Sequence, residues 1–74
     1  MRQPYRMTAI IEGEDEGFVA LCPELDIASQ GLSIEEARSN LIEVLTLFFE
    51  TADETEVARR VHNEVFVTQV EVVG

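Results

Sequence analysis

The segment from residue 31 to residue 50 most strongly constrains the fold, because it combines a helix start signal with a sustained helical repeat. Ser33, followed three residues later by Glu36, forms a capping box in which the hydroxyl accepts a backbone N–H and the carboxylate reaches back to another. Gly31 supplies the turn just before the helix. The sequence therefore predicts one long amphipathic helix over this segment.

The apolar surface of this helix is wider than one sheet can cover. With about 100° between successive residues, the line that faces the sheet contains Ile34, Ala37, Leu41, Leu45 and Phe48. Residues on both flanks widen the apolar arc to roughly 220°, about twice what packing on one sheet requires. We therefore expect part of the arc to form an oligomer or partner interface, because an uncovered apolar patch favours aggregation. The candidate interface residues are Ile42, Val44, Leu47, Phe48 and Phe49.

Alternation of apolar and polar residues predicts strands before and after the helix. The first two strands are joined by the acidic turn at residues 13–17, and Pro23 ends the second because proline cannot donate to a strand ladder. The last strand carries apolar residues on both faces, with Val65 and Val67 on one and Phe66, Val70 and Val72 on the other. The predicted strands cover residues 5–12, 18–22, 27–30 and 64–73.

The polar stretch after the long helix predicts a short second helix. Its cap is either Thr51, paired with Glu54, or Asp53, paired with Glu56. The helical crossover from the third to the fourth strand should be right-handed, which places the fourth strand parallel to the first. The predicted fold class is α+β, a two-layer β-β-β-α-(α)-β sandwich that forms one domain over residues 1–74. One face of its antiparallel meander receives the long helix, and no second layer is predicted for the other face.

The charge balance limits the classes of partner. Fifteen acidic residues against five basic ones give a net charge of −10, and such a surface repels phosphate backbones. We therefore expect no direct binding of nucleic acid by this chain, whereas a basic protein would be attracted. A chain of 74 residues buries a small core and often gains stability by forming a dimer or tetramer.

The cellular compartment follows from the cysteine count and from hydropathy. A single cysteine, Cys22, excludes an intrachain disulfide and a zinc site built from thiolates, which fits a reducing environment. No apolar run has the length of a signal peptide or of a membrane span. We therefore expect a cytoplasmic protein that does not enter a membrane.

No group of residues predicts catalysis, a cofactor or a metal site. The single histidine, His62, has no nucleophile or metal ligand spaced near it and reads as a surface residue, and Cys22 reads as a buried thiol. The acidic turn reads as a solvated loop, and a weak cation site or a patch for a basic partner is the alternative. We therefore expect a protein that is not an enzyme, and a degenerate nuclease is the least favoured interpretation. The acidic residues at this turn are Glu12, Glu14, Asp15 and Glu16.

The order of these elements and several short motifs resemble a known family. The motifs are Glu16-Gly17-Phe18, Cys22-Pro23-Glu24-Leu25, Gln30-Gly31 and Ser33-Ile34-Glu35-Glu36-Ala37. Together with the flanking strands they are similar to the HicB-like antitoxin family, including its short stand-alone members, over nearly the whole chain. The resemblance implies a partial RNase H-like or double-stranded-RNA-binding-like fold and self-association. It also implies that the protein neutralises a small basic HicA-type toxin, an mRNA-cleaving ribonuclease, by covering its active site.

Two departures from the family pattern keep a second interpretation open. Full-length HicB proteins carry a C-terminal helix-turn-helix or ribbon-helix-helix domain, whereas these 74 residues end after the fourth predicted strand, so DNA binding is not implied. Residues 26–31 also lack the Gly-Cys pair that many antitoxin members have. In this respect the chain resembles the stand-alone members. The chain is therefore either an antitoxin or an orphan oligomeric scaffold or regulator that has the same fold and no toxin partner.

Overall fold

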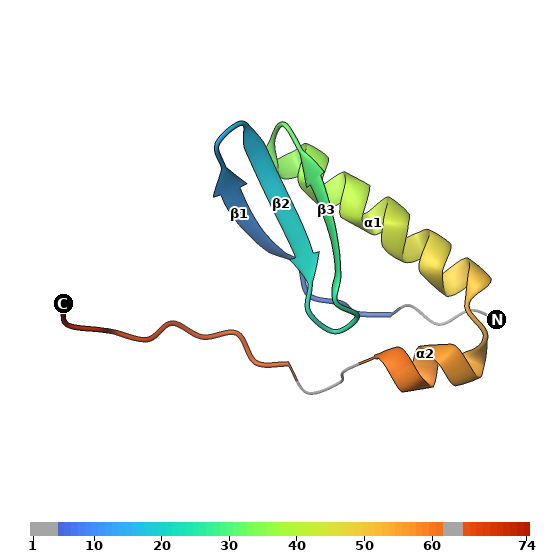
Figure 1. The fold of residues 1–74 in the computed structure, drawn as a ribbon. Helices are drawn as coiled ribbons and strands as arrows, with labels where there is room; N and C mark the ends of the chain where they lie inside the picture. The colour runs from blue at the N-terminus through green and yellow to red at the C-terminus, as the bar shows by residue number, and fades with distance from the viewer. Residues whose placement is uncertain (1–4, 62–64) are drawn as a thin grey trace.

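The computed structural model describes residues 5–61 and 65–74 of the chain. Three strands form one antiparallel sheet in the order β1-β2-β3. The long helix α1 packs across one face on the β3 side, and α2 follows beside the end of the sheet (Figure 1). The α+β class and the three-stranded meander followed by helices are therefore confirmed. The elements are β1 (Ile10–Glu14), β2 (Gly17–Cys22), β3 (Ile27–Gly31), α1 (Ile34–Thr51) and α2 (Glu54–Arg60).

The hairpin of β1 and β2 has a tighter turn than predicted. Glu14 pairs with Gly17, which leaves Asp15 and Glu16 as a two-residue turn. The pairing continues to Ile10 opposite Leu21. The register turns Ile10, Val19 and Leu21 to the face opposite α1, where they are half-buried. As predicted, no second layer covers this face within residues 5–61 and 65–74.

The first strand begins five residues later than predicted, at Ile10 instead of Tyr5. The reason lies in β2, which ends at Cys22 before Pro23, so the ladder has no N–H donor to continue. The backbone N–H of Thr8 donates instead to both carboxylate oxygens of Glu24, each at 3.0 Å. In the segment that was predicted to pair as a strand, a side-chain carboxylate therefore accepts the backbone N–H of Thr8 in place of a strand partner.

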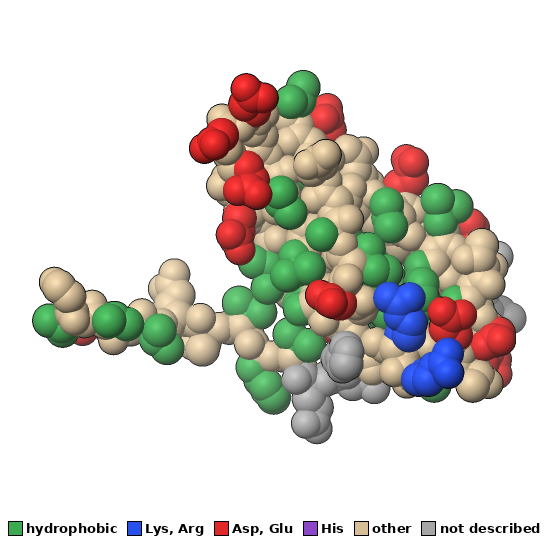
Figure 2. Space-filling model, viewed as in Figure 1, with side chains coloured by type: hydrophobic (Ala, Val, Ile, Leu, Met, Phe, Trp, Pro, Cys, Tyr) green, Lys and Arg blue, Asp and Glu red, His purple; other side chains and the backbone are tan. Residues whose placement is uncertain are grey.

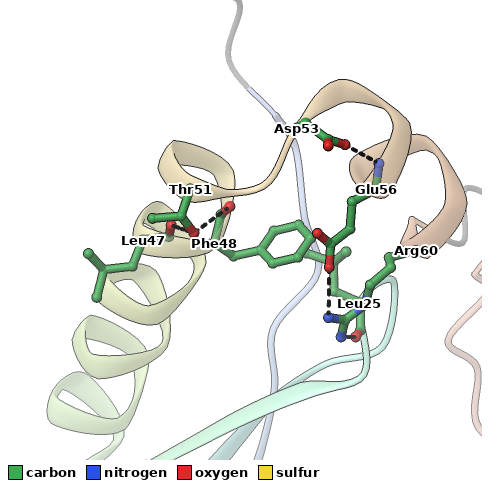
Figure 3. A network of polar contacts seen from close by, with 7 residues as sticks. All are labelled: Leu25, Leu47, Phe48, Thr51, Asp53, Glu56 and Arg60. Carbon is green, nitrogen blue, oxygen red and sulfur yellow. Dashed lines mark hydrogen bonds and ion pairs between the residues drawn. The ribbon is translucent and has the colours of Figure 1, made fainter.

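Both helices begin with side-chain caps of the predicted kind. Ser33 Oγ accepts the N–H of Glu36 at 3.0 Å, and the Glu36 carboxylate accepts the N–H of Leu32 at 2.9 Å. Of the two caps left open for the second helix, the structure uses Asp53, whose carboxylate accepts the N–H of Glu56 at 2.8 Å (Figure 3). Capping by short polar residues therefore sets the start of each helix.

The core between α1 and the sheet is small. Within the predicted inner line of α1, Ala37 and Leu41 are buried, and Leu45 and Phe48 are half-buried. Ile34 remains 53% exposed, so its placement on the buried line is wrong: it is the first residue of α1, and contact with the sheet begins one turn later at Ala37. The fully buried apolar residues are Ala20, Cys22, Leu25, Ala37 and Leu41.

The predicted fourth strand over residues 64–73 is wrong for the described part of that segment. Residues 65–74 belong to no strand and run away from the sheet (Figure 1). The described sheet ends at three strands, and α2 is held beside the β2–β3 turn by the hydrogen bond from Arg60 to the Leu25 carbonyl, at the opposite side of the sheet from the open edge of β1 that a fourth strand would need. Val65 and Val67 therefore do not join the open face of the sheet, and Glu64 and His62 lie outside the described residues.

The close approach of β3 to α1 depends on Gly31. A Cβ at this position would lie 2.5 Å from the backbone nitrogen of Ala37 and 2.8 Å from the carbonyl carbon of Glu36. Both neighbours are backbone atoms, so a larger residue would force α1 to shift. At Gly13, by contrast, the nearest atom to a new Cβ belongs to the side chain of Phe18 and lies 3.7 Å away.

We expect Gly31→Ala to lower the free energy of unfolding by about 1–3 kcal/mol, the usual range for overpacking. The matched control is Gly13→Ala, because neither glycine has a positive φ and the pair differs in steric contact. Urea unfolding of both variants at one protein concentration measures the difference. Equal losses in the two variants would show that the close approach does not limit stability.

Candidate interaction site

Glu24 is a buried carboxylate that ties the N-terminal segment to the sheet. Its side chain is 8% exposed and accepts hydrogen bonds from the N–H of Thr8, from Thr8 Oγ1 at 2.6 Å and from Cys22 Sγ at 3.5 Å. Burial alone would raise the pKa of Glu24, but the hydrogen bonds from Thr8 outweigh it and hold the pKa below its usual value. Because Thr8 and Cys22 donate to both of its oxygens, the Glu24 carboxylate serves to hold the N-terminal segment against the sheet.

Cys22, which donates to the Glu24 carboxylate, is fully buried. Burial raises the pKa of its thiol, and the neighbouring Glu24 carboxylate raises it further. A thiol held in its neutral form is a poor nucleophile. The prediction of a buried, structural Cys22 is therefore confirmed as to its burial.

We expect Glu24→Gln to lower the free energy of unfolding at pH 7 by about 1–3 kcal/mol, because the charge-assisted hydrogen bonds from Thr8 are weakened. The folded pKa of Glu24 is lower than the unfolded one, so its contribution is present above the unfolded value of about 4.3. The contribution is lost as the pH falls through the lower folded value. Below about pH 4 the native chain should therefore lose stability more steeply than Glu24→Gln.

Urea unfolding between pH 7 and pH 3 measures both effects. The control is Glu14→Gln, which changes an exposed carboxylate that makes no hydrogen bond within the described residues. If Glu24→Gln and the native chain lost stability in parallel on acidification, the proposed role of the carboxylate would be wrong.

Arg60 of α2 fastens this helix to the body of the protein (Figure 3). Its Nη2 donates to the carbonyl of Leu25 at 3.3 Å, and its Nη1 lies 4.0 Å from the carboxylate of Glu56. The guanidinium carbon lies 5.2 Å from the centroid of the Phe48 ring, a cation–π distance. Arg60 therefore covers one of the two phenylalanines that were predicted to need a partner.

The other phenylalanine, Phe49, is covered by the N-terminal segment. The Tyr5 ring stacks on it with centroids 4.0 Å apart and planes 9° apart, and Phe48 meets it edge-on at 5.2 Å. The 100° between Phe48 and Phe49 is thus accommodated within one chain, by contacts from the N-terminal segment and from α2. Sequence reasoning missed Tyr5 and Arg60 in this role, because their ring partners lie far away in the sequence.

The remaining candidate interface residues are exposed but do not form one surface. Ile42 is 47% exposed, Val44 38% and Leu47 55%. At 100° per residue, Val44 and Leu47 lie on the flank of Asn40, whose side-chain amide donates to the Gln30 carbonyl of β3 at 2.8 Å. Ile42 lies on the opposite flank. The apolar arc of α1 is therefore divided into two separate exposed patches.

The acidic turn projects into solvent at the end of the β1–β2 hairpin, where acidic side chains gather (Figure 2). None of its carboxylates makes an ion pair or a hydrogen bond within residues 5–61 and 65–74. The shallow hollow beside the turn is also lined by Glu36 and by the exposed Leu32. No group of three or more ligands that could hold a metal occurs in the described part of the chain. The acidic turn therefore offers a surface of unpaired negative charge. Its exposed acids are Glu12, Glu14, Asp15 and Glu16.

No protein-family model matches the chain, and neither a curated protein nor a solved structure matches it. The similarity to HicB-like antitoxins therefore stays a prediction from the motifs and the order of elements. Among the helices that the structure describes, none has the length and apolar character needed to cross a bilayer.

Proposed function

We propose that this chain is a non-catalytic, HicB-like antitoxin of the cytoplasm that binds a small basic HicA-type toxin and covers its RNA-cleaving site. The observation that supports the proposal is the acidic turn, whose four exposed carboxylates have no basic partner among the described residues. The chain as a whole carries a net charge of −10. Such a surface attracts a basic protein and repels RNA.

The proposed mechanism is occupation of a binding surface and requires no chemical step. A ribonuclease binds the phosphate backbone of its substrate through basic residues. The carboxylates of the acidic turn lie on the two-residue turn and on the adjoining end of β1, and they present negative charge in a compact projection that can occupy the same basic surface. The toxin is then blocked because RNA and the antitoxin compete for one site.

We expect the double substitution Asp15→Asn and Glu16→Gln to slow association with the basic toxin at least about tenfold at low salt, because electrostatic steering is weakened. The matched control, Glu35→Gln with Glu43→Gln, removes the same charge from exposed positions of α1. Stopped-flow association with the small basic protein encoded in the adjacent reading frame measures the rates, and the difference should shrink as salt is added.

Equal rates for the two double variants would contradict a role for the acidic turn. Failure to recover any small basic protein by co-purification with the native chain would contradict the antitoxin proposal itself.

The second candidate function is an orphan oligomeric scaffold or regulator of the same fold. The specific observation in its favour is the exposed apolar segment at residues 65–74, which suits self-association and carries one charged residue, Glu71. A stable homo-oligomer, together with a gene neighbourhood that contains no toxin-like frame, would distinguish this function from the first.

A further inference from the structure

Residues 65–74, here called the C-terminal tail, form few hydrogen bonds with the described chain and bury little apolar surface. The tail makes no hydrogen bond to the sheet, and its described contact is a weak one from Thr68 Oγ1 to the neighbouring carbonyl of Gln69 at 3.4 Å. Its apolar side chains are largely exposed, and its backbone groups pair with none of the described strands. The exposed side chains are Phe66 (88%), Val67 (62%), Val70 (81%), Val72 (81%) and Val73 (96%).

The tail also makes the molecule long for its size. The Cα radius of gyration is 14.1 Å, and the longest principal extent is 48 Å. A compact domain of this length would have a radius of gyration of about 11 Å. The extra length corresponds to the tail, which runs clear of the sheet (Figure 1).

The outer edge of β1 is open in the described part of the chain. In the order β1-β2-β3, β1 pairs on one side with β2, and no described segment pairs on its other side. Counting outward from the two-residue turn, the hydrogen-bonded pairs of the hairpin fall at Glu14, Glu12 and Ile10. Ile11 and Gly13 therefore turn their backbone N–H and C=O groups toward the open edge. The edge at β3 differs, because Asn40 already donates to its Gln30 carbonyl.

The apolar pattern of the tail also fits this edge. A strand beside β1 would have one face toward the α1 side of the sheet, near the stacked rings of Tyr5 and Phe49. Its other face would lie beside Ile10 and Leu21 on the open face of the sheet. The tail presents apolar residues to both sides, which is the pattern of a strand buried on two faces. An exposed strand that stays in water would not need it.

We propose that the tail of one copy of this protein adds as a fourth strand to the β1 edge of a second copy, so that two chains exchange tails reciprocally. Each copy has one open β1 edge and one tail. In a symmetric pair, the tail of each copy can therefore pair with the β1 edge of the other, and no edge or tail is left without a partner. The tail carries one charged residue, Glu71, and is otherwise mostly apolar, so it attracts a basic protein far less than the acidic turn does, whereas a hydrogen-bonding edge accepts any extended backbone. The described direction of the tail, away from its own β1, favours the edge of another copy.

The exchange gives a structural form to the self-association that the resemblance to HicB-like proteins implies, and it does not depend on a toxin. It therefore is tested with the purified full chain alone. Toxin binding can fail while the exchange is upheld, and the reverse is also true.

Val70→Asp tests the exchange, because it places a charge at the middle of the tail and leaves the core untouched. We expect the native chain to dimerise in sedimentation velocity, and Val70→Asp to raise the dimer dissociation constant at least about tenfold. The control is Leu32→Asp, which makes the same change at an apolar residue that is 77% exposed in the loop before α1. Protection of the buried Cys22 thiol from alkylation verifies that every variant is folded.

A mixed sample of isotope-labelled and unlabelled chains shows which copy receives the tail. Filtered nuclear Overhauser contacts between the tail methyls of one copy and Ile10 or Ile11 of the other support the exchange. A native chain that stays monomeric, a dimer that Val70→Asp leaves unchanged, or tail contacts confined to one copy would each overturn it.

Discussion

The structure depends on how closely α1 can approach the sheet. Ala20 and Cys22 on β2 and Ala37 on α1 have no exposed surface, and their short side chains bring the two layers together. Gly31 makes the same approach possible where β3 leads into the helix. A core assembled from small residues is thin, and Leu25 and Leu41 are its largest fully buried members. Apolar burial alone therefore stabilises the molecule little, since the hydrophobic contribution scales with the area buried.

Polar side chains compensate by holding the periphery to this core. Glu24 fastens the segment before β1, Arg60 fastens α2, and Asn40 closes part of the β3 edge. Each of them satisfies a backbone group that the three-stranded ladder cannot reach. This arrangement follows from the requirement that buried or half-buried backbone groups find partners. The tail and the outer edge of β1 differ, because within the described residues their backbone groups have no protein partner and face solvent.

Local features of the sequence predicted most of the fold. The cap at Ser33, the end of the second strand before Pro23 and the hairpin of the first two strands involve residues within a few positions of each other, and all of them are found. The errors concern contacts between distant residues. Periodicity cannot tell that Tyr5 and Arg60 cover the two phenylalanines, or that residues 65–74 pair with no strand of the described sheet. The acidic turn was foreseen from its composition, whereas the buried Glu24 was not, because a carboxylate beside a proline gives no sign that Thr8 lies against it.

The stack of Tyr5 on Phe49 has a consequence for how this protein can be observed. The chain contains one tyrosine and no tryptophan, so its near-ultraviolet emission arises from a single phenol. That phenol lies where the N-terminal segment meets the last turns of α1. Its fluorescence therefore reports the docking of the N-terminal segment on the helix. A local opening there becomes visible without a label and separately from the melting of the sheet.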